Sequence, residues 1–590
     1  MSLLISLLIS FLAVRGFRFD MTRTGLVLRN TESFVWLLLL LFFCWVCVKS
    51  WKDPDRRLKR CAALYGILIA VFTVLGKILS TLEYFAWIWE NPHNLLHFLN
   101  MLFSYALLYY SFAFLSFALL KQIKSEKPSG AVRNISMKKV FLIWAVLMLV
   151  YIPWWMYHYP GIVSSDSGNQ IKDALTTNTL SDWNPAFVTL LIRAVILPVI
   201  HLGGSINAAV GVCTFLQMMI LTFVFALAFE RACCYLQNKT LLFLIFLFFA
   251  VYPVHNIYSV TMWKDILFSA CFLGFFLCLD TASEDETNFF SSKAKCLLLF
   301  FTMALMPLLR HNGLFITVIM ALYLPFRFKT FRKTAAVICC SALLLTAGWK
   351  LILLPKLRTE PIPSGEYLSV PLQQVTRVLV KRYDDLSPET VEEIQNFFTI
   401  PDIRTEYAEK TVDPIKMYFN SEKFAEDRGK FFALWFRLGI KYPVEYAEAF
   451  LHNNYGYWYP ETRWWISMSG IQMHDPIPEL QHKPILELNI VDKINQWYTS
   501  EQYEKTPVLP LLFKPGACFW LWLFCGCYCF YNNRRKFILF IPGFSLWLVI
   551  LFSPVYDEFR YVYGLFCALP VLIAGTLLSH VNKTQPEREK

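Results

Sequence analysis

Charged residues are scarce in this chain. Asp, Glu, Lys and Arg make up 17% of its 590 residues, whereas an average soluble domain carries about 25%. Hydrophobic residues account for 56% of the chain, and the mean hydropathy is +0.45. An ordinary soluble protein is therefore excluded. Apolar runs of roughly 17 to 25 residues recur instead, and each is long enough to cross a hydrocarbon core of about 30 Å.

The alternation of polar and apolar residues that marks membrane β-barrel strands is missing from these runs. Only helices and closed barrels satisfy their backbone hydrogen bonds in lipid, so the sequence predicts an all-α polytopic membrane protein. The thirteen candidate spans are residues 33–49, 61–79, 95–120, 140–157, 206–229, 240–254, 263–280, 296–309, 314–326, 335–354, 508–530, 537–553 and 562–580.

Several site signatures are also missing. The polar segment 355–507 holds no cysteine, which excludes a disulfide framework or a cysteine zinc site there. The chain has no P-loop, dinucleotide-binding glycine pattern, nucleophile elbow or HExxH sequence. Residues 1–14 lack the charged start of a signal peptide, so we expect a retained membrane or interfacial segment. The side of the membrane on which residues 1–33 lie stays open.

Positive charge is concentrated in short loops between the spans. The net charge is +12, and Lys and Arg gather in residues 49–60, 121–139, 327–333 and 534–536. Membrane proteins keep such loops in the cytoplasm. This distribution argues against a nucleic-acid partner and predicts a multi-pass protein of the cell membrane, with the lipid bilayer as its partner.

One apolar run, residues 187–202, is short and contains Arg193 and Pro198. Counting it as a span would move the basic loop 327–333 to the outer face, against the charge rule. We therefore predict a helix that lies at the outer surface.

The spans and loops divide the chain into four parts. Residues 1–130 are predicted to be accessory membrane helices, and residues 135–354 a membrane core whose first outer loop is 158–205. Residues 355–507 are predicted to form a mainly helical extracytoplasmic subdomain, because they are polar and long enough for one. Residues 508–590 supply the last membrane helices and a cytoplasmic tail.

The unusual polar residues all fall at the predicted outer face. Asp166 follows a span and the helix-stopping pair Pro160-Gly161, and Asp173 lies seven residues further on. Lys264 and Asp265 open another span, and Arg310 and His311 form the tip of a hairpin. A fourth group, Asp557, Glu558 and Arg560, lies between the last two spans. Ionisable groups at membrane depth are costly and mostly functional, so their shared side predicts one polar cavity.

Such a cavity suits a lipid-linked phosphate, whose head lies at the interface. Lys264, Arg310, His311 and Arg560 are the candidates to bind the phosphate charge. Asp166, with Asp265 as a second carboxylate, could deprotonate an acceptor hydroxyl or bind a divalent cation, Mg²⁺ or Mn²⁺.

Plain structural roles stay open for every one of these groups. Asp166 could cap its turn, and Lys264 with Asp265 could simply flank a helix. Arg310 and His311 could make an interhelical contact, and residues 557–560 could form a surface loop.

The order of these motifs resembles the C-type (GT-C) membrane-embedded glycosyltransferases. Residues 159–167, Tyr-Pro-Gly-Ile-Val-Ser-Ser-Asp-Ser, are similar to the loop that carries the essential acid of that superfamily. Residues 182–185 resemble its entry to a juxtamembrane helix, with Asn184 in place of a histidine, and residues 261–265 resemble its second acidic motif. The sequences at 310–313, 370–377 and 556–561 are similar to an uncharacterised bacterial multi-spanning family placed beside it. The resemblance covers roughly residues 135–580.

The resemblance implies a GT-C-like bundle of about 13 transmembrane helices. It also implies an inverting transfer from a polyprenyl-phosphate sugar donor at the extracytoplasmic face, often with a divalent cation. Asp166 would be the catalytic base or a metal-linked acid, Asp265 the second acid, and Lys264, Arg310 and Arg560 the phosphate ligands. Three residues of the outer segment would border the cavity or, alternatively, lie on an amphipathic helix at the membrane: Gln373, Gln374 and Arg377.

We therefore expect a membrane glycosyltransferase that moves a sugar to a glycan, a teichoic-type polymer, a lipid or a protein acceptor. A transporter or flippase of lipid-linked sugars is the main alternative. Such a transporter would show inverted repeats and polar residues near the middle of the membrane, whereas here they crowd one side. A non-catalytic membrane scaffold is a third candidate.

Overall fold

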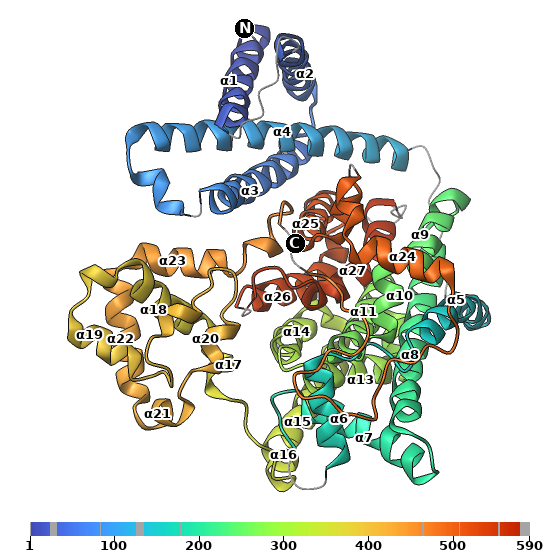
Figure 1. Cartoon of the computed structure of the whole chain (residues 1–590). Helices are drawn as coiled ribbons and strands as arrows, with labels where there is room; N and C mark the ends of the chain where they lie inside the picture. Colours follow the sequence, from blue (N-terminus) through green and yellow to red (C-terminus); the bar gives the residue numbers. More distant parts are fainter. Residues whose placement is uncertain are drawn as a thin grey trace.

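The computed structural model describes residues 2–23, 32–82, 84–125, 135–176, 180–462, 465–506, 508–552 and 555–578. Within these ranges the chain folds into helices, with loops and isolated β-bridges between them (Figure 1). The prediction of an all-α chain is confirmed for this described part.

The N-terminal helices form a group at one side of the molecule, drawn in blue at the top of Figure 1. They are α1 (Ser2–Arg23), α2 (Glu32–Lys52), α3 (Arg56–Thr81), η1 (Phe85–Trp89) and α4 (Pro92–Ser125). Asp55 caps α3 by accepting a hydrogen bond from the Leu58 amide at 3.0 Å. The same carboxylate accepts from the Tyr531 hydroxyl at 2.7 Å, which ties this group to the C-terminal helices.

The main bundle combines the central helices of the chain with its last ones. The central helices are α5 (Met137–Tyr157), α6 (Ser165–Leu175), α7 (Ala186–His201), α8 (Ile206–Tyr235), α9 (Lys239–Val251), α10 (Pro253–Val260), α11 (Lys264–Glu284), α12 (Glu286–Ser291), α13 (Lys293–Leu309), α14 (Gly313–Arg327), η2 (Lys329–Phe331), α15 (Arg332–Gly348), η3 (Trp349–Leu353) and α16 (Leu354–Lys356). The last ones are α24 (Asn489–Thr499), η7 (Gln502–Lys505), η8 (Leu509–Phe513), α25 (Pro515–Asn532), η9 (Arg534–Leu539), α26 (Phe540–Ile550), α27 (Phe559–Ile573) and η10 (Ala574–Leu578).

Nine helical segments of the described chain are long and apolar enough to cross a membrane, which indicates a multi-pass membrane protein. They are Val35–Lys52, Arg56–Thr81, Pro92–Gln122, Met137–Tyr157, Ile206–Tyr235, Lys239–Val260, Lys264–Glu284, Lys329–Lys356 and Phe559–Leu578. The other four predicted spans coincide with α13, α14, α25 and α26, helices of 17, 15, 18 and 11 residues. Their role as crossings stays a prediction.

Two helices form the centre of the bundle. In α11 and α27, 78% and 83% of the apolar window is buried, against 22% in α5. They run in the same direction, since Gly564 of α27 packs against Phe272 of α11, and Gly575, in η10 just after α27, lies beside Asp280 further along α11. The first turns of both helices, which carry Lys264, Asp265 and Arg560, therefore lie at one end of the bundle.

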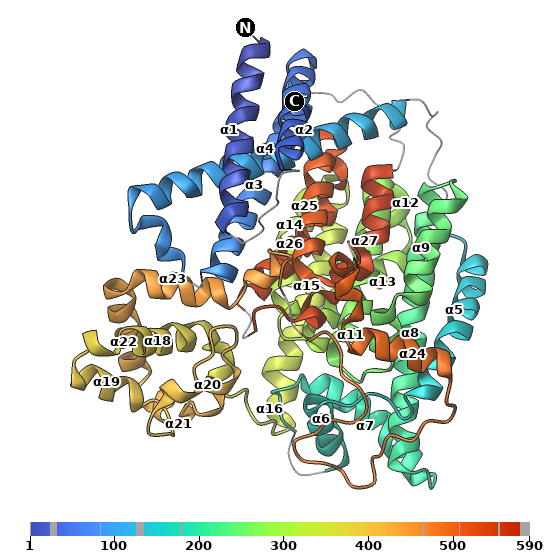
Figure 2. The ribbon, with the colours of Figure 1, turned by 45° about the horizontal axis from the view of Figure 1, so that its top comes forward.

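The predicted surface helix 187–202 is α7, which packs against α6 and α8. Arg193, which interrupts its apolar run, donates hydrogen bonds to the carbonyl groups of Asp173 at 2.7 Å and Ala174 at 3.1 Å. These carbonyls belong to the last turn of α6, whose acceptors need partners from outside the helix. Arg193 therefore fixes α7 to α6, the helix that carries Asp166 (Figure 2).

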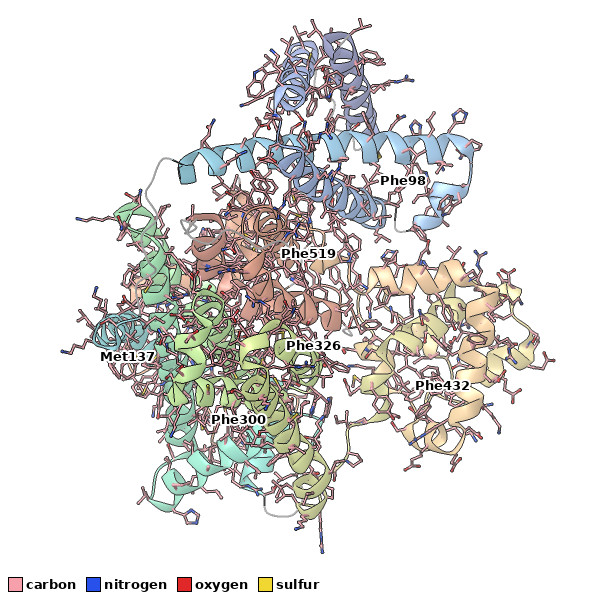
Figure 3. The ribbon with its side chains drawn as sticks, turned by 180° about the vertical axis from the view of Figure 1, so that it is seen from behind. Phe98, Met137, Phe300, Phe326, Phe432 and Phe519 are labelled. Atoms are coloured by element: carbon pink, nitrogen blue, oxygen red, sulfur yellow. The ribbon has the colours of Figure 1, made fainter. Side chains whose placement is uncertain are left out.

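The predicted subdomain 355–507 divides into two parts. Its first part has a hydrophobic core of its own, which includes Leu372, Ile403 and Phe431. Its helices are α17 (Ser364–Tyr367), α18 (Ser369–Lys381), η4 (Tyr383–Asp385), α19 (Pro388–Gln395), η5 (Ile403–Glu406), α20 (Asp413–Met417), α21 (Ser421–Glu426), α22 (Arg428–Lys441) and α23 (Pro443–His452), followed by η6 (Tyr455–Tyr457). These helices project to one side of the bundle, around Phe432 in Figure 3.

The second part, residues 465–506, packs against the main bundle instead. Ile466, Leu480 and Tyr498 belong to the core of the bundle. Polarity alone could not separate the two parts, because the second part keeps its polar residues on its outer side.

Candidate functional site

Asp166 lies in the first turn of α6, and the loop before it is fixed to the start of α11. Gly161 has φ +140°, and a Cβ there would come within 2.5 Å of Thr214, so glycine is required. The Ile162 amide donates to the Val260 carbonyl at 2.9 Å, and the Met262 amide donates to the Ile162 carbonyl at 2.9 Å. This short bridge brings Asp166 beside Lys264.

The Asp166 carboxylate lies between two cations from distant parts of the chain. Its Oδ2 atom is 3.8 Å from Lys264 Nζ and 3.3 Å from Arg560 Nη1. The side chain is 38% exposed, so the carboxylate reaches the surface. Lys264 and then Arg560 lower the pKa of Asp166 below its usual value, although burial acts in the opposite direction. The group is therefore a carboxylate at neutral pH.

Arg560 is held in place by an acid and by aromatic rings. Its Nε atom is 3.2 Å from Glu558 Oε1. The centre of its guanidinium lies 5.0 Å from the ring of Trp263, 5.9 Å from Trp465 and 5.4 Å from Tyr561. Such stacking suits the planar guanidinium ion and fixes the face that it presents to Asp166.

A second ion pair lies deeper in the bundle. Arg310 Nη1 is 3.1 Å from Asp265 Oδ1, and the two side chains are 8% and 1% exposed. The Arg310 guanidinium also lies 4.2 Å from the ring centre of Tyr561 and 5.9 Å from that of Phe268. Tyr561 therefore contacts both arginines and joins the buried pair to the partly exposed pair of Arg560 and Asp166.

The loop before α7 completes the site. Lys264 donates a hydrogen bond to Asn184 Oδ1, and Asn184 Nδ2 donates to the Asp166 carbonyl at 3.4 Å. His311 Nε2 donates to the Asp182 carbonyl at 2.9 Å. Burial lowers the pKa of His311 against the opposite effect of Asp182, so the imidazole is neutral at pH 7.

Each Lys and Arg of this cluster has an acidic partner. Lys264, Arg310 and Arg560 are paired with Asp166, Asp265 and Glu558, one acid for each cation. A phosphate that binds to Lys264 and Arg560 must therefore compete with the Asp166 carboxylate.

Residues 174–590 match the model of a family described as "Family of unknown function (DUF6020)". The chain belongs to this family. No curated protein and no solved structure matches the chain. The region shared with the DUF6020 family contains Asp265, Arg310 and Arg560, and it begins at residue 174, just after Asp166.

Three predicted site residues of the DUF6020 region make structural contacts within the subdomain. In α18, Gln373 donates to the Ala408 carbonyl at 2.7 Å and Gln374 to the Tyr446 carbonyl at 3.2 Å. Arg377 is 2% exposed and pairs with Glu448 at 2.5 Å and Glu409 at 3.4 Å. Their side chains hold α18, α23 and the neighbouring loops together. The structure does not bring them to Asp166.

The two predicted ligands of a divalent cation are both paired with cationic side chains in the structure. Asp166 pairs with Lys264 and Arg560, and Asp265 pairs with Arg310. The prediction of Mg²⁺ or Mn²⁺ at these carboxylates stays a prediction. In the described ranges no group of three or more His, Cys, Asp and Glu side chains could hold a metal ion.

Several participants were not predicted as site residues. Glu558 holds Arg560, and Trp263 and Tyr561 stack on it. Their positions beside Lys264 and Arg560 in the sequence were the available signal. Asp557, their neighbour, accepts from Thr462 at 2.5 Å, and burial raises its pKa. It therefore belongs to a separate buried contact.

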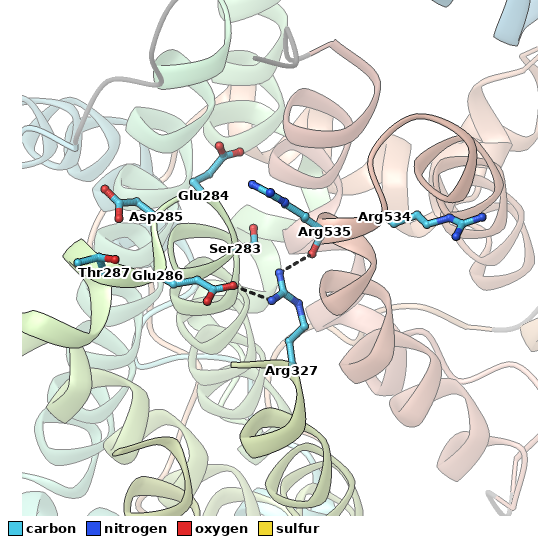
Figure 4. Close-up of a pocket in the computed structure, with 8 residues that line it drawn as sticks. All are labelled: Ser283, Glu284, Asp285, Glu286, Thr287, Arg327, Arg534 and Arg535. Atoms are coloured by element: carbon cyan, nitrogen blue, oxygen red, sulfur yellow. Dashed lines mark hydrogen bonds and ion pairs between the residues drawn. The ribbon is translucent and has the colours of Figure 1, made fainter. Parts of the chain in front are cut away.

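One cavity of the described chain lies far from this cluster. Its volume is about 570 Å³. Figure 4 shows the residues that line it, and two of them, Ser283 and Glu284, belong to the last turn of α11. It is lined by Ser283, Glu284, Asp285, Glu286, Thr287, Arg327, Arg534 and Arg535. The 21 residues of α11 rise by about 30 Å, so this cavity and the Asp166 cluster lie at opposite faces of the bundle.

Proposed function

We propose that the protein is a membrane glycosyltransferase of about thirteen transmembrane helices. It moves a sugar from a polyprenyl-phosphate donor to a cell-envelope acceptor at the outer face of the membrane. One observation carries the proposal: an exposed carboxylate, Asp166, meets Lys264 and Arg560 at one end of an apolar bundle. A lipid-linked phosphate would present its charge at this depth, and a nearby base would serve the acceptor.

The ion pairs of Asp166 suggest how donor binding prepares the base. A donor phosphate that takes hydrogen bonds from Lys264 and Arg560 draws both cations away from Asp166. The pKa of Asp166 then rises from its lowered value, because its cationic partners have been taken up. A carboxylate with a higher pKa is the stronger base.

The transfer itself is a single displacement at the anomeric carbon. The acceptor oxygen forms a bond to this carbon, and the bond from the carbon to the phosphate oxygen breaks. The acceptor proton passes to the Asp166 carboxylate, and the leaving phosphate keeps the electron pair of the broken bond. Lys264 and Arg560 stabilise the added phosphate charge, which is the role of positioned cations in such reactions.

Arg310 and Asp265 are assigned a positioning role in this mechanism. They are buried beneath the exposed cluster, and Arg310 stacks on Tyr561, which also contacts Arg560. The pair holds the first turns of α11 and α27 in register, so that Lys264 and Arg560 face the same carboxylate.

Reconstitution of the full chain in liposomes with a polyprenyl-phosphate sugar tests the proposal. Asp166→Asn should abolish sugar transfer while the protein still folds and inserts. Asp173→Asn, on the same helix, is the matched control and should keep transfer near the wild-type rate. Normal transfer by Asp166→Asn would overturn the proposed function.

A flippase of lipid-linked sugars is the alternative, because α11 carries buried acids at both ends. Asp280, near its far end, pairs with Arg231 at 2.6 Å and Lys536 at 3.1 Å. Between Asp265 and Asp280 the buried residues of α11 are apolar apart from Ser269, which supports an enzyme over a polar path. Movement of a labelled lipid-linked sugar across the liposome membrane without transfer would favour the flippase.

A further inference from the structure

The subdomain carries an apolar surface that its own core does not use. In α22, Phe431, Leu434 and Leu438 are buried in the subdomain core. Phe432, Phe436 and Ile440 are 43%, 63% and 69% exposed. Residues four apart lie on one face of a helix, so the exposed three form a stripe along the outside of the subdomain.

The stripe ends at a hollow between α22 and α23. This hollow has a volume of about 280 Å³ and is lined by Trp435, Phe436, Gly439, Ile440 and Tyr446. Its walls are fixed, because Trp435 Nε1 donates to Gln374 at 2.9 Å and the Tyr446 hydroxyl donates to the Trp435 carbonyl at 2.6 Å. We call this hollow, with the side chains that line it, the α22–α23 corner.

Helix α22 is basic, and two of its cations, Arg437 and Lys441, lie beside the α22–α23 corner. Helix α22 carries Arg428, Lys430, Arg437 and Lys441 and no acidic residue. Arg437 pairs with Glu393 and Lys430 with Asp427, while Arg428 and Lys441 lie over aromatic rings. Apolar side chains next to Lys and Arg are typical of protein surfaces that enter the headgroup layer of a membrane.

The fold places the far end of α23, the helix that borders this corner, next to the ends of membrane helices. Phe450, in α23, contacts the ring of Phe552, just beyond α26, at 5.5 Å. Glu448, also in α23, accepts from the Phe85 amide at 2.7 Å, and Phe85 lies between the apolar helices α3 and α4. In Figures 1 and 2, α23 lies on the side of the subdomain that faces α3 and α4, and α21 lies on the far side.

We propose that the α22–α23 corner docks the subdomain on the bilayer surface beside α3 and α4. Ile440 and Phe436 enter the acyl-chain boundary, and Arg437 and Lys441 lie at anionic lipid headgroups. The partner is the same membrane that the bundle spans, so no second protein is needed. The docking holds whether or not the Asp166 cluster transfers sugar.

Photo-crosslinking of the full chain in lipid nanodiscs tests this docking. Ile440→p-benzoylphenylalanine should form lipid adducts on illumination, detected by mass spectrometry. Glu422→p-benzoylphenylalanine, exposed on α21, is the matched control and should give several-fold fewer. Replacing zwitterionic lipid with phosphatidylglycerol should raise the adduct yield at position 440, and adding Lys441→Glu should lower it.

Three results would overturn the docking. They are equal adduct yields at positions 440 and 422, an absence of lipid adducts at 440, and a crosslink from 440 to a second copy of the chain. The last would identify the corner as an interface between copies. Because crosslinking does not depend on turnover, its outcome is separate from that of the transfer assay.

Discussion

The ion pair of Arg310 and Asp265 can be tested by measuring protein stability, without any assay of activity. The two side chains are 3.1 Å apart and 8% and 1% exposed. The rings of Tyr561 and Phe268 lie beside the guanidinium, so a freed charge could not turn to water. Removing one partner of a buried ion pair costs about 3–5 kcal/mol, whereas replacing both is often close to neutral.

Three variants make the test: Asp265→Asn, Arg310→Met and the double variant. Each single change should lower the free energy of unfolding by about 3–5 kcal/mol. The double variant should lose clearly less than the sum, since neighbours in contact are not additive. Thermal unfolding in lipid-containing micelles, followed by intrinsic fluorescence, gives the comparison.

Arg404→Met supplies the control, because Arg404 pairs with Asp402 where the side chains are 34% and 37% exposed. Exposed ion pairs contribute about 0–1 kcal/mol, so its loss should be small. Additive losses in the double variant, or singles no worse than the control, would refute the assignment of Arg310 and Asp265 as a buried positioning pair.

Three further predictions follow from the geometry. Arg560→Gln should weaken binding of a polyprenyl-phosphate donor by about 1.5–3 kcal/mol, roughly ten- to hundredfold in Kd, as native mass spectrometry would show. The lowered pKa of Asp166 means that its ion pairing stabilises the fold above its unfolded pKa and is lost as the pH falls through the lower folded value. The difference in melting temperature between the wild type and Asp166→Asn should therefore stay constant from pH 7 to about 5 and shrink below about 4. Arg377→Met should leave the buried Glu448 without its cationic partner, cost about 3–5 kcal/mol and expose the subdomain to proteolysis. A variant as resistant to a protease as the wild type would contradict this.

The convergence at Asp166 could be predicted because the chain is so apolar. Where few charges occur, those at the ends of predicted spans stand out, and the basic loops place them on one side. Asp166, Lys264 and Arg560 were predicted from this pattern, and the structure places Lys264 and Arg560 each within 4 Å of Asp166.

Which groups these side chains contact could not be predicted from the same pattern. Whether Arg310 meets a ligand or Asp265 depends on how α11 packs against the turn after α13, which is a tertiary property. Gln373, Gln374 and Arg377 show the same limit, because a polar helix facing a polar cavity and one bonded to its own subdomain have similar sequences. The helices α13, α14 and α26 were predicted as spans from composition alone. They are shorter than an upright crossing of the bilayer needs, so their role as spans stays a prediction.

The central claim is that Asp166 acts as the base and competes with the donor phosphate for Lys264 and Arg560. The most direct measurement determines both donor affinity and sugar transfer on the same Asp166→Asn protein. We predict that transfer is lost while the donor binds at least as tightly as to the wild type, because a neutral side chain no longer holds the two cations. Transfer at the wild-type rate, or loss of donor binding together with transfer, would contradict it.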